Sequence, residues 1–517
     1  MFNERPVEGA SYQHKGKPNM AATSDFTSFY WYDFETFGIN SRADRPAQFA
    51  GLRTDMALNP LGEGEIFYAK PTLDYLPSPE SCLLTGITPQ HCEEHGVEES
   101  KFAGKIWDRL NEPGTVSIGY NTLGFDDEVC RFLFWRNFLD PYAHSFGACA
   151  RWDLFPLVCA TWALRGSGIV WPQWEQIDPN VYPRAAGRTG VCFKLEFLTK
   201  ANGIEHGHAH DALSDVHATI GLARLIREKE PKLWAWAFKN RTTEAVEAAV
   251  DSGKPVVWVT PKFGIKNGCT RIVAALYGKG RDRIMWDLMH DPEELRTLSL
   301  DELRSRLFPS REARLNGVKP LPVQRLKTNT SPFVCSTLKV LSADRAARYG
   351  VDFNVVTANY QKFLEVAAIV RPILSILFDE KGAMPASDVD LDLYGGGFPS
   401  ASDKARFRMI RKTSPQQLAS MAAAGEVYFG DSRFNELLLR YRARNWPETL
   451  TSEELRTWQR FCRSRVLEGR PPFRTVTQYF EEIDRIGEHA DIENEALQDL
   501  FNDLYEWGEK VGAACGD

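Results

Sequence analysis

Apolar runs that suit buried strands alternate with runs of helical periodicity over residues 28–230. The strand-like runs are residues 29–34, 48–54, 65–70 and 115–120, and the helix-like runs are residues 103–110, 126–137 and 211–229. This alternation is typical of an α/β domain, in which helices pack against a central sheet. We therefore predict an α/β domain at residues 28–230, preceded by a flexible polar tail at residues 1–27.

The pattern changes twice beyond residue 230. Short strand-like runs follow at residues 256–259, 271–277 and 283–288, and the capping-box spacing of Ser299 and Glu302 predicts a helix start among them. Apolar residues then recur at helical spacing at residues 363–378, 434–443, 452–467 and 492–506. We predict a small β domain at residues 231–352 and an all-helical domain at residues 354–517.

Composition and charge narrow the class of protein without changing this division. The 517 residues are 43% hydrophobic and 25% charged, as in an ordinary globular protein, and no apolar run is long enough to span a membrane. The first 25 residues lack an apolar signal-peptide core, so we expect a cytoplasmic chain. The 10 cysteines form no Cys-x-x-Cys pair, which predicts reduced, buried thiols rather than a disulfide scaffold or a zinc site. The net charge of −7 argues against a surface that is basic all over but allows a local basic groove.

Two acids stand in an aromatic, strand-like run. Asp33 and Glu35 follow several aromatic residues, and alternation along a strand puts both carboxylates on one face, one pleat apart. Neighbouring buried carboxylates repel each other and lose hydration, and a bound divalent cation is the usual compensation. A structural carboxylate pair is one alternative. A phosphatase strand of the Asp-x-Asp type is another, although here the second acid is Glu.

A second acidic segment, Asp126-Asp127-Glu128, follows a predicted strand and turn at the start of a predicted helix. Acids favour helix N-termini because they cap free backbone N–H groups and interact well with the helix dipole. We interpret Asp127 and Glu128 in this way. Asp126 comes first, directly after the turn, and we predict that it binds metal.

A third segment combines histidines with an acid. His206, His208 and His210 alternate, and Asp215 follows at the start of an amphipathic helix. Alternating histidines allow a zinc site, but a polar loop with incidental histidines is the simpler interpretation of His206 and His208. A histidine just before a helix and an acid one turn inside it can face one site, as we expect of His210 and Asp215. We expect His217, elsewhere on that helix, to be structural.

The ordered set of Asp33, Glu35, Asp126, His210 and Asp215 resembles the DEDDh family of 3′–5′ exonucleases. Within that family, the chain is similar to the bacterial exodeoxyribonuclease I group at residues 45–50, 84–89, 198–206 and 441–445. The resemblance runs from about residue 29 to near the C-terminus. It departs at residues 166–190 and at the N-terminal tail, which are longer than the family pattern leads us to expect, and neither departure touches the acidic motifs.

The resemblance implies a ribonuclease H-like exonuclease domain with a mixed sheet, followed by an SH3-like β domain and an all-helical C-terminal domain. It also implies hydrolysis of single-stranded DNA from its 3′ end to 5′-mononucleotides, in DNA repair and recombination. Two Mg²⁺ ions, with Mn²⁺ as a substitute, are expected on Asp33, Glu35, Asp126 and Asp215, because Mg²⁺ prefers oxygen ligands. His210 is then the expected general base.

Substrate contacts and partners are implied by the same resemblance. Contacts are expected from Glu35, Thr36, Lys194, Arg131, Tyr142 and Phe146, since cations track phosphates and aromatic rings stack on bases. For the last three, a role in helix surface and core is the alternative. The expected partners are single-stranded DNA and the acidic C-terminal tail of single-stranded-DNA-binding protein, and we expect a monomer that does not associate with membranes.

Three other functions stay open at this point. The nearest is the same chemistry on RNA, although the ribonuclease T and oligoribonuclease groups are expected to be single small domains. A non-catalytic module that binds single strands is another, but it would not need His210. A zinc-dependent hydrolase built on the three alternating histidines is the third.

Overall fold

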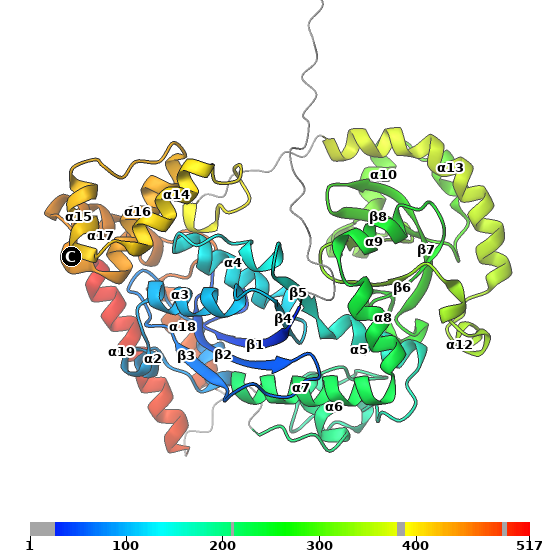
Figure 1. Ribbon diagram of the computed structural model, residues 1–517, viewed down its shortest axis with the longest axis horizontal. Helices are drawn as coiled ribbons and strands as arrows, with labels where there is room; N and C mark the ends of the chain where they lie inside the picture. Colours follow the sequence, from blue (N-terminus) through cyan, green and yellow to red (C-terminus); the bar gives the residue numbers. More distant parts are fainter. Residues whose placement is uncertain (1–25, 208–210, 380–387, 489–493, 517) are drawn as a thin grey trace, which may run out of the picture.

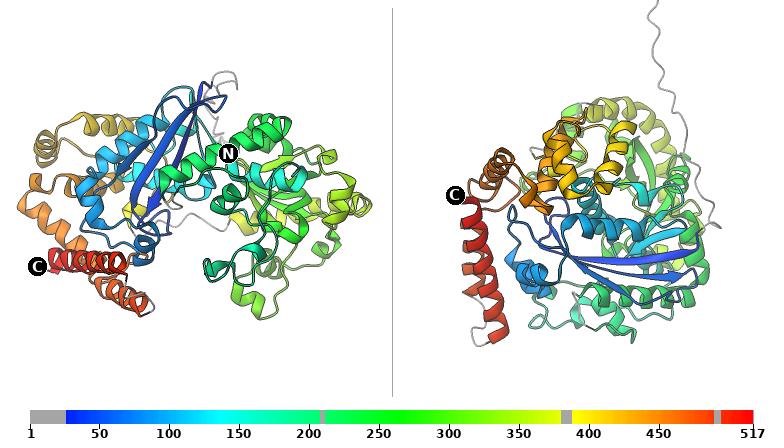
Figure 2. Two further views of the ribbon diagram at one scale, coloured as in Figure 1. Left: turned by 90° about the horizontal axis from the view of Figure 1, so that it is seen from below. Right: turned by 60° about the vertical axis from the view of Figure 1, so that its left-hand side comes forward.

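The computed structural model describes residues 26–207, 211–379, 388–488 and 494–516, which form three parts in a row (Figure 1). An α/β part lies in the middle, a β part with a long curved helix lies on one side, and a helical part lies on the other. The left view of Figure 2 shows the same arrangement. Of the predicted N-terminal tail, residues 1–25 lie outside the described residues. No helix within the described ranges is long and apolar enough to cross a membrane.

The α/β part is built on a five-stranded sheet in the order β3-β2-β1-β4-β5. Strand β1 is antiparallel to β2 and parallel to β4, which confirms the predicted mixed sheet. The strands are β1 (Ser28–Thr36), β2 (Pro46–Asp55), β3 (Glu65–Tyr68), β4 (Thr115–Gly119) and β5 (Ala150–Asp153). The helices are α1 (Pro79–Thr85), α2 (Pro89–His95), α3 (Glu99–Leu110), α4 (Asp126–Arg136), α5 (Leu154–Leu164), α6 (Leu195–Ala201), α7 (Ala212–Lys229), α8 (Pro231–Asn240) and α9 (Thr243–Val250). The four predicted strands are present with slightly shifted ends.

Alternation along β1 divides its side chains between two layers of helices. Phe29 and Trp31 pack in one core with residues of α5 and α7, whereas Tyr30, Tyr32 and Phe34 pack in another with α3 and α4. The register of β1 against β2 is regular from Ser28 to Glu35. Asp33 and Glu35 therefore continue the face of Phe29 and Trp31, on the side of the sheet that α7 covers.

The β part is a second five-stranded sheet, in the order β10-β6-β7-β8-β9, with every neighbouring pair antiparallel. Its strands are β6 (Val256–Val259), β7 (Thr270–Lys279), β8 (Asp282–Asp287), β9 (Val323–Lys327) and β10 (Phe333–Cys335). Its helices are α10 (Leu300–Leu307), α11 (Arg311–Leu315), α12 (Ala343–Arg348) and α13 (Phe353–Asp379), the last of which curves over the sheet (Figure 1). The predicted capping box is confirmed, because Ser299 and Glu302 each accept a hydrogen bond from the backbone of the other.

The helical part contains α14 (Ala401–Lys412), α15 (Pro415–Ala423), α16 (Ser432–Asn445), α17 (Ser452–Val466), α18 (Val476–Gly487) and α19 (Glu495–Gly516). The predicted helices at residues 434–443 and 452–467 are α16 and α17. The one predicted at residues 492–506 corresponds to α19, although residues 489–493 lie outside the described part of the chain. Helices α18 and α19 share a core with α1 and α2, so this part packs directly on the α/β part. All ten cysteines are free and buried, as predicted.

A buried set of ion pairs joins the helical part to the α/β part. We call it the interdomain ion cluster, and it comprises Arg45, Asp74, Glu99, Arg136, Asp388, Asp390, Arg440, Arg444 and Arg465. Arg465 contacts three of the acids: its guanidinium nitrogens lie 2.7 Å from Asp74 Oδ2, 2.8 Å from Asp388 Oδ2 and 2.7 Å from Asp390 Oδ2. Buried charges of this kind are tolerated only when each finds an opposite charge.

Candidate active site

Three carboxylates meet where β1 ends above the start of α7. Asp33, Glu35 and Asp215 each offer one oxygen, and these oxygens all lie within 4.8 Å of one another. Asp33 and Glu35 come from one face of β1, and Asp215 comes from the first turn of the helix that covers this face. The alternation that buries Phe29 and Trp31 on this side thus also aims both β1 acids at α7.

Burial and repulsion between carboxylates raise the pKa of the two β1 acids, Asp33 and Glu35. The pKa of Asp33 is well above its ordinary value, first through loss of hydration and then through the charges of Asp126, Asp215 and Glu35. Loss of hydration, followed by the charges of Asp215, Asp126 and Asp211, raises the pKa of Glu35 to about 9. Neither Asp33 nor Glu35 has an ion-pair partner within the residues that the structure describes. The cluster is therefore short of positive charge, as a site for divalent cations would be.

Asp126 approaches the cluster from the opposite layer of helices. It begins α4, is buried, and accepts a hydrogen bond from the backbone N–H of Phe34 at 3.2 Å. Burial raises its pKa to about 8, although that hydrogen bond acts in the other direction. Asp126 is therefore close enough to add to the repulsion on Asp33, but it is not one of the three residues whose oxygens meet within 4.8 Å. The next residue, Asp127, pairs with Arg131, Arg151 and His144, as expected of a structural acid.

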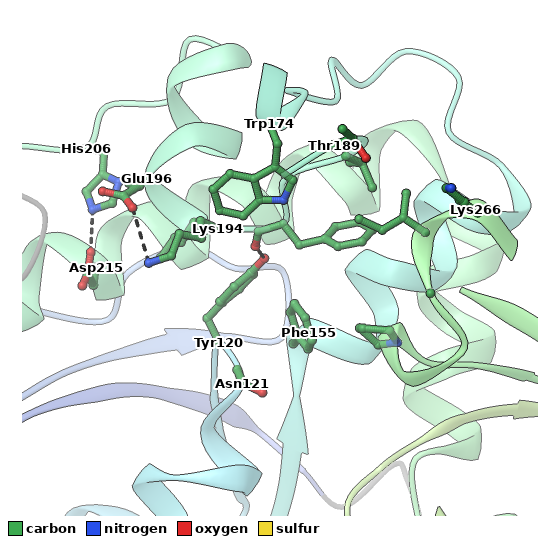
Figure 3. Close-up of a pocket in the computed structure, with 16 residues that line it drawn as sticks. Tyr120, Asn121, Phe155, Trp174, Thr189, Lys194, Glu196, His206, Asp215 and Lys266 are labelled. Carbon is green, nitrogen blue, oxygen red and sulfur yellow. Dashed lines mark hydrogen bonds and ion pairs between the residues drawn. The ribbon is translucent and has the colours of Figure 1, made fainter. Parts of the chain in front are cut away.

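The histidine that contacts the cluster is one that the sequence did not single out. His206 Nε2 lies 2.5 Å from Asp215 Oδ1, and its Nδ1 lies 3.0 Å from the hydroxyl oxygen of Thr199 (Figure 3). Its interpretation as an incidental loop residue is therefore wrong. Spacing alone could not reveal this contact, because it depends on how residues 202–207 return from α6 toward α7. His208 and His210 lie outside the described residues.

A pocket of about 740 Å³ opens beside Asp215 and His206 (Figure 3). Lys194 lines it, directly before α6, and its Nζ lies 3.6 Å from Glu196 Oε1. The same Nζ lies 5.2 Å from the ring centroid of Tyr182. A lysine thus stands next to the carboxylates, in reach of whatever group occupies the pocket.

The other predicted substrate contacts lie farther apart. Arg131 lines a second pocket of about 610 Å³, between α4 and the β part, but it pairs with Asp127 at 2.9 Å and Glu128 at 3.1 Å. Tyr142 packs beneath its guanidinium, and the ring of Phe146 is 56% exposed. The hydroxyl of Thr36, one residue beyond Glu35, donates to the carbonyl of Gly38. These residues flank the carboxylate cluster without touching it.

Comparisons with known proteins agree with this architecture. Three family models match in order along the chain: "Exonuclease" at residues 30–223, "Exonuclease I SH3-like domain" at residues 239–380 and "Exonuclease I C-terminal domain" at residues 387–511. Exodeoxyribonuclease I of Haemophilus influenzae is 37% identical, over 94% of this chain and 98% of the relative.

Solved structures extend the likeness to three dimensions. Escherichia coli exonuclease I in complex with a dA16 oligonucleotide superimposes with a TM-score of 0.84 and 35% identity, over 94% of this chain and 100% of the other. The zinc-bound form of an E. coli exonuclease I complex with single-stranded DNA has a TM-score of 0.82 and 35% identity, over 94% and 99% of the two chains. The class is thus a three-domain exonuclease, with a ribonuclease H-like, an SH3-like and a helical domain. The chain belongs to the exodeoxyribonuclease I family.

Proposed function

We propose that this chain is a 3′–5′ exonuclease that hydrolyses single-stranded DNA to 5′-mononucleotides, in DNA repair and recombination. The observation that carries the proposal is the group of three carboxylates at the end of β1, of which Asp33 and Glu35 have no ion-pair partner among the described residues, in a chain of this family. Relatives solved with single-stranded oligonucleotides support DNA as the substrate. The extra SH3-like and helical domains favour DNA over the RNA alternative.

The chemistry of the cluster suits divalent metal ions. Asp33, Glu35, Asp126 and Asp215 offer only oxygen, the ligand that Mg²⁺ prefers. The raised pKa values of Asp33, Glu35 and Asp126 are consistent with carboxyls that lack a counter-charge. We assign two Mg²⁺ ions to these four residues, with Mn²⁺ as a substitute. A bound metal pair would activate the attacking water and stabilise the departing oxygen.

The remaining roles fall to this chain's own side chains. His210 takes the proton from the attacking water, since a neutral imidazole is available near pH 7. His206, held by Thr199, fixes the orientation of Asp215. Lys194 contacts the terminal nucleotide beside the carboxylates, and Glu35 and Thr36 contact its sugar-phosphate.

A basic groove leads away from the cluster toward the SH3-like domain. The pocket that Arg131 lines is also lined by Arg42, Arg151, Lys262, Arg325 and Lys327. Cations along a groove track the phosphates of a single strand, so we assign the strand's path to this side, with Tyr142 and Phe146 as stacking contacts. The acidic tail of single-stranded-DNA-binding protein is a further proposed partner. The proposed enzyme is a cytoplasmic monomer with an exonuclease domain at residues 28–230, an SH3-like domain that extends through α13 and a helical domain after it.

Digestion of 5′-labelled single-stranded DNA tests the proposal. With Mg²⁺, the wild type should give a ladder that shortens from the 3′ end, and chelation with EDTA should stop it. His210→Ala should lose most turnover but keep its DNA affinity, because the proton acceptor is removed while the groove is untouched. His217→Ala is the matched control, since this exposed histidine of α7 should be dispensable.

Two outcomes would count against the proposal. A wild-type protein that binds DNA but leaves it undigested with Mg²⁺ and with Mn²⁺ would favour a non-catalytic binding module. Faster digestion of RNA than of DNA would make RNA, not DNA, the assigned substrate. Turnover unchanged in His210→Ala would remove only the assignment of the general base.

A further inference from the structure

The pocket beside Asp215 is closed on its far side by a segment without an assigned role, residues 166–190. Trp174 and Thr189 of this segment line the pocket together with Lys194 and with Ile265 and Lys266 of the SH3-like domain. Figure 3 shows the Trp174 ring projecting into the space between Lys194 and Thr189, on the opposite side from Tyr120 and Phe155.

The segment is folded firmly enough to present Trp174 in a fixed position. Trp174 donates its backbone N–H to the carbonyl of Gly190 at 2.8 Å, and Gln173 pairs with Val191 in an antiparallel bridge. The indole ring packs in a small core with the buried Ala185 and Cys192. The segment also packs closely against the SH3-like domain. At Gly190 there is no room for a side chain, because an added Cβ would lie 2.8 Å from Cγ2 of Ile265.

The walls of the pocket match the parts of a nucleotide. The rings of Trp174, Phe193, Tyr120 and Phe155 line it, and aromatic rings suit contact with a nucleobase. Trp174 is only 7% exposed and the Arg188 guanidinium lies 4.8 Å from its ring centroid, so the indole offers the pocket an edge rather than a free face. Lys194 and the carboxylate of Asp215 mark its other end, where a phosphate would meet the catalytic cluster. The volume of about 740 Å³ lies within the range of small-molecule sites.

The indole N–H of Trp174 is also free to recognise a ligand. Nε1 makes no hydrogen bond to any residue that the structure describes, yet it is not among the fully buried unpaired atoms. A tryptophan in such a position offers an apolar ring and one polar donor together.

We propose that Trp174 contacts the base of the 3′-terminal nucleotide, so that residues 166–190 help to determine which terminal residues the enzyme accepts. This inference rests on the proposed exonuclease function. The 5′ phosphate of that nucleotide points to Asp215 and Lys194, and its base points to Trp174. The released 5′-mononucleotide has the same chemistry, so the test must separate the two.

The first arm compares two 5′-labelled oligonucleotides that differ only at the 3′ end, one ending in deoxyadenosine and the other in an abasic residue. The rate of removing the first nucleotide is measured under single-hit conditions. The wild type should prefer the complete nucleotide, and Trp174→Leu should reduce that preference by about tenfold, as expected for loss of one base–aromatic contact. A purely structural role would slow both substrates equally and leave the ratio unchanged.

Two further variants guard against misfolding. Ile177→Ala alters the same small core without touching the pocket, and its ratio should equal that of the wild type. Thr189→Trp places a large side chain at an exposed residue of the rim, and it should lower the ratio even if Trp174→Leu does not fold. A wild-type ratio in both Trp174→Leu and Thr189→Trp, or an equal loss in Ile177→Ala, would overturn the inference.

The second arm measures binding of dAMP with Mg²⁺ by calorimetry. Weaker dAMP binding by Trp174→Leu with an unchanged terminal ratio would assign the pocket to the released product and overturn the role at the strand's end. If the wild type digests DNA but neither measurement responds to Trp174→Leu, the inference fails while the proposed function stands. If the wild type digests nothing, the proposed function fails, and a dAMP affinity that falls about tenfold in Trp174→Leu would still assign a nucleotide to this pocket.

Discussion

The carboxylates at the end of β1 and those of the interdomain ion cluster are both buried, yet their pKa values move in opposite directions. The pKa of Glu35 rises to about 9, whereas the pKa values of Asp74 and Asp390 fall well below their ordinary range. Loss of hydration acts in the same direction at both places. The difference is that Arg444, Arg465 and their neighbours surround the second set, and no described arginine or lysine pairs with Asp33 or Glu35.

This difference distinguishes a candidate metal site from a structural contact between domains. Acids that already have arginines are satisfied and serve to hold two domains together. Buried acids that lack arginine partners are stabilised by binding divalent ions or a proton. That no arginine in the described ranges pairs with Asp33 or Glu35 is therefore as informative about function as the presence of the acids.

The largest expected effect comes from Asp33→Asn. It should lower turnover of single-stranded DNA by roughly 10³-fold, since bound metal contributes several kcal/mol of transition-state stabilisation. The free energy of unfolding in EDTA should be unchanged or higher, because a repelled carboxylate is removed. Glu94→Gln, at a side chain that is 77% exposed, is the control for both measurements. A substantial loss of stability in Asp33→Asn would erase the contrast between the two clusters.

Arg465→Met should behave in the opposite way. It removes one arginine partner from each of three buried acids, and we expect the free energy of unfolding to fall by about 3–5 kcal/mol in denaturant titrations. Arg463→Met on the same helix is the matched control, because that side chain is 53% exposed and pairs only at the surface. Equal stability of the two variants would mean that the interdomain cluster contributes nothing.

Acid should weaken the interdomain cluster selectively. The pKa values of Asp74 and Asp390 are lower in the folded protein than in the unfolded chain, so their stabilisation is present above about pH 4 and is lost as the pH falls below it. We expect a loss of about 1–2 kcal/mol from this source between about pH 5 and pH 3. In Arg465→Met, where one of the arginine partners of these acids is already removed, the loss of stability over the same pH interval should be smaller. If the free energy of unfolding of Arg465→Met fell as steeply with pH as that of Arg463→Met, the result would contradict this assignment.

Alkali should weaken the metal-free active site, which is the smallest of these effects. The pKa of Glu35 is about 9 in the folded protein and ordinary in the unfolded chain, so its contribution to stability is largest below about pH 4.5 and declines as the pH rises toward 9. Glu35→Gln removes this titration and should add about 1 kcal/mol to stability in EDTA near pH 8. Denaturant titrations in EDTA and with Mg²⁺ check this, since bound metal should flatten the wild-type slope. An unchanged slope in Glu35→Gln would place the titrating group elsewhere.

The sequence predicts the geometry of the carboxylate cluster well where the information is local. Alternation along β1 places Asp33 and Glu35 on one face, and the helix that begins near residue 211 brings Asp215 to the same face. The capping box at Ser299 is equally local, since one hydrogen-bonding pattern spans four residues. In each case, the geometry of a single strand or helix turn settles the outcome.

Features that depend on distant residues escape such reasoning. Asp74 and Arg465 are 391 positions apart, and nothing near either one predicts the pair. β5 is a four-residue edge strand that contains Arg151 and Asp153, so it lacks a hydrophobic signal. The contact of His206 with Asp215 follows from the course of a loop rather than from periodicity.

The interdomain ion cluster also decides where this chain can be divided. Family models split it near residues 230 and 383, as if three modules had been joined end to end. Asp74 and Glu99, however, belong to the first module, while Arg440, Arg444 and Arg465 belong to the last. An excised nuclease module would keep the fully buried Asp74 but lose two of its guanidinium partners, Arg444 and Arg465. The unit that can be moved between proteins is therefore the whole chain, and the catalytic module is not an independent part.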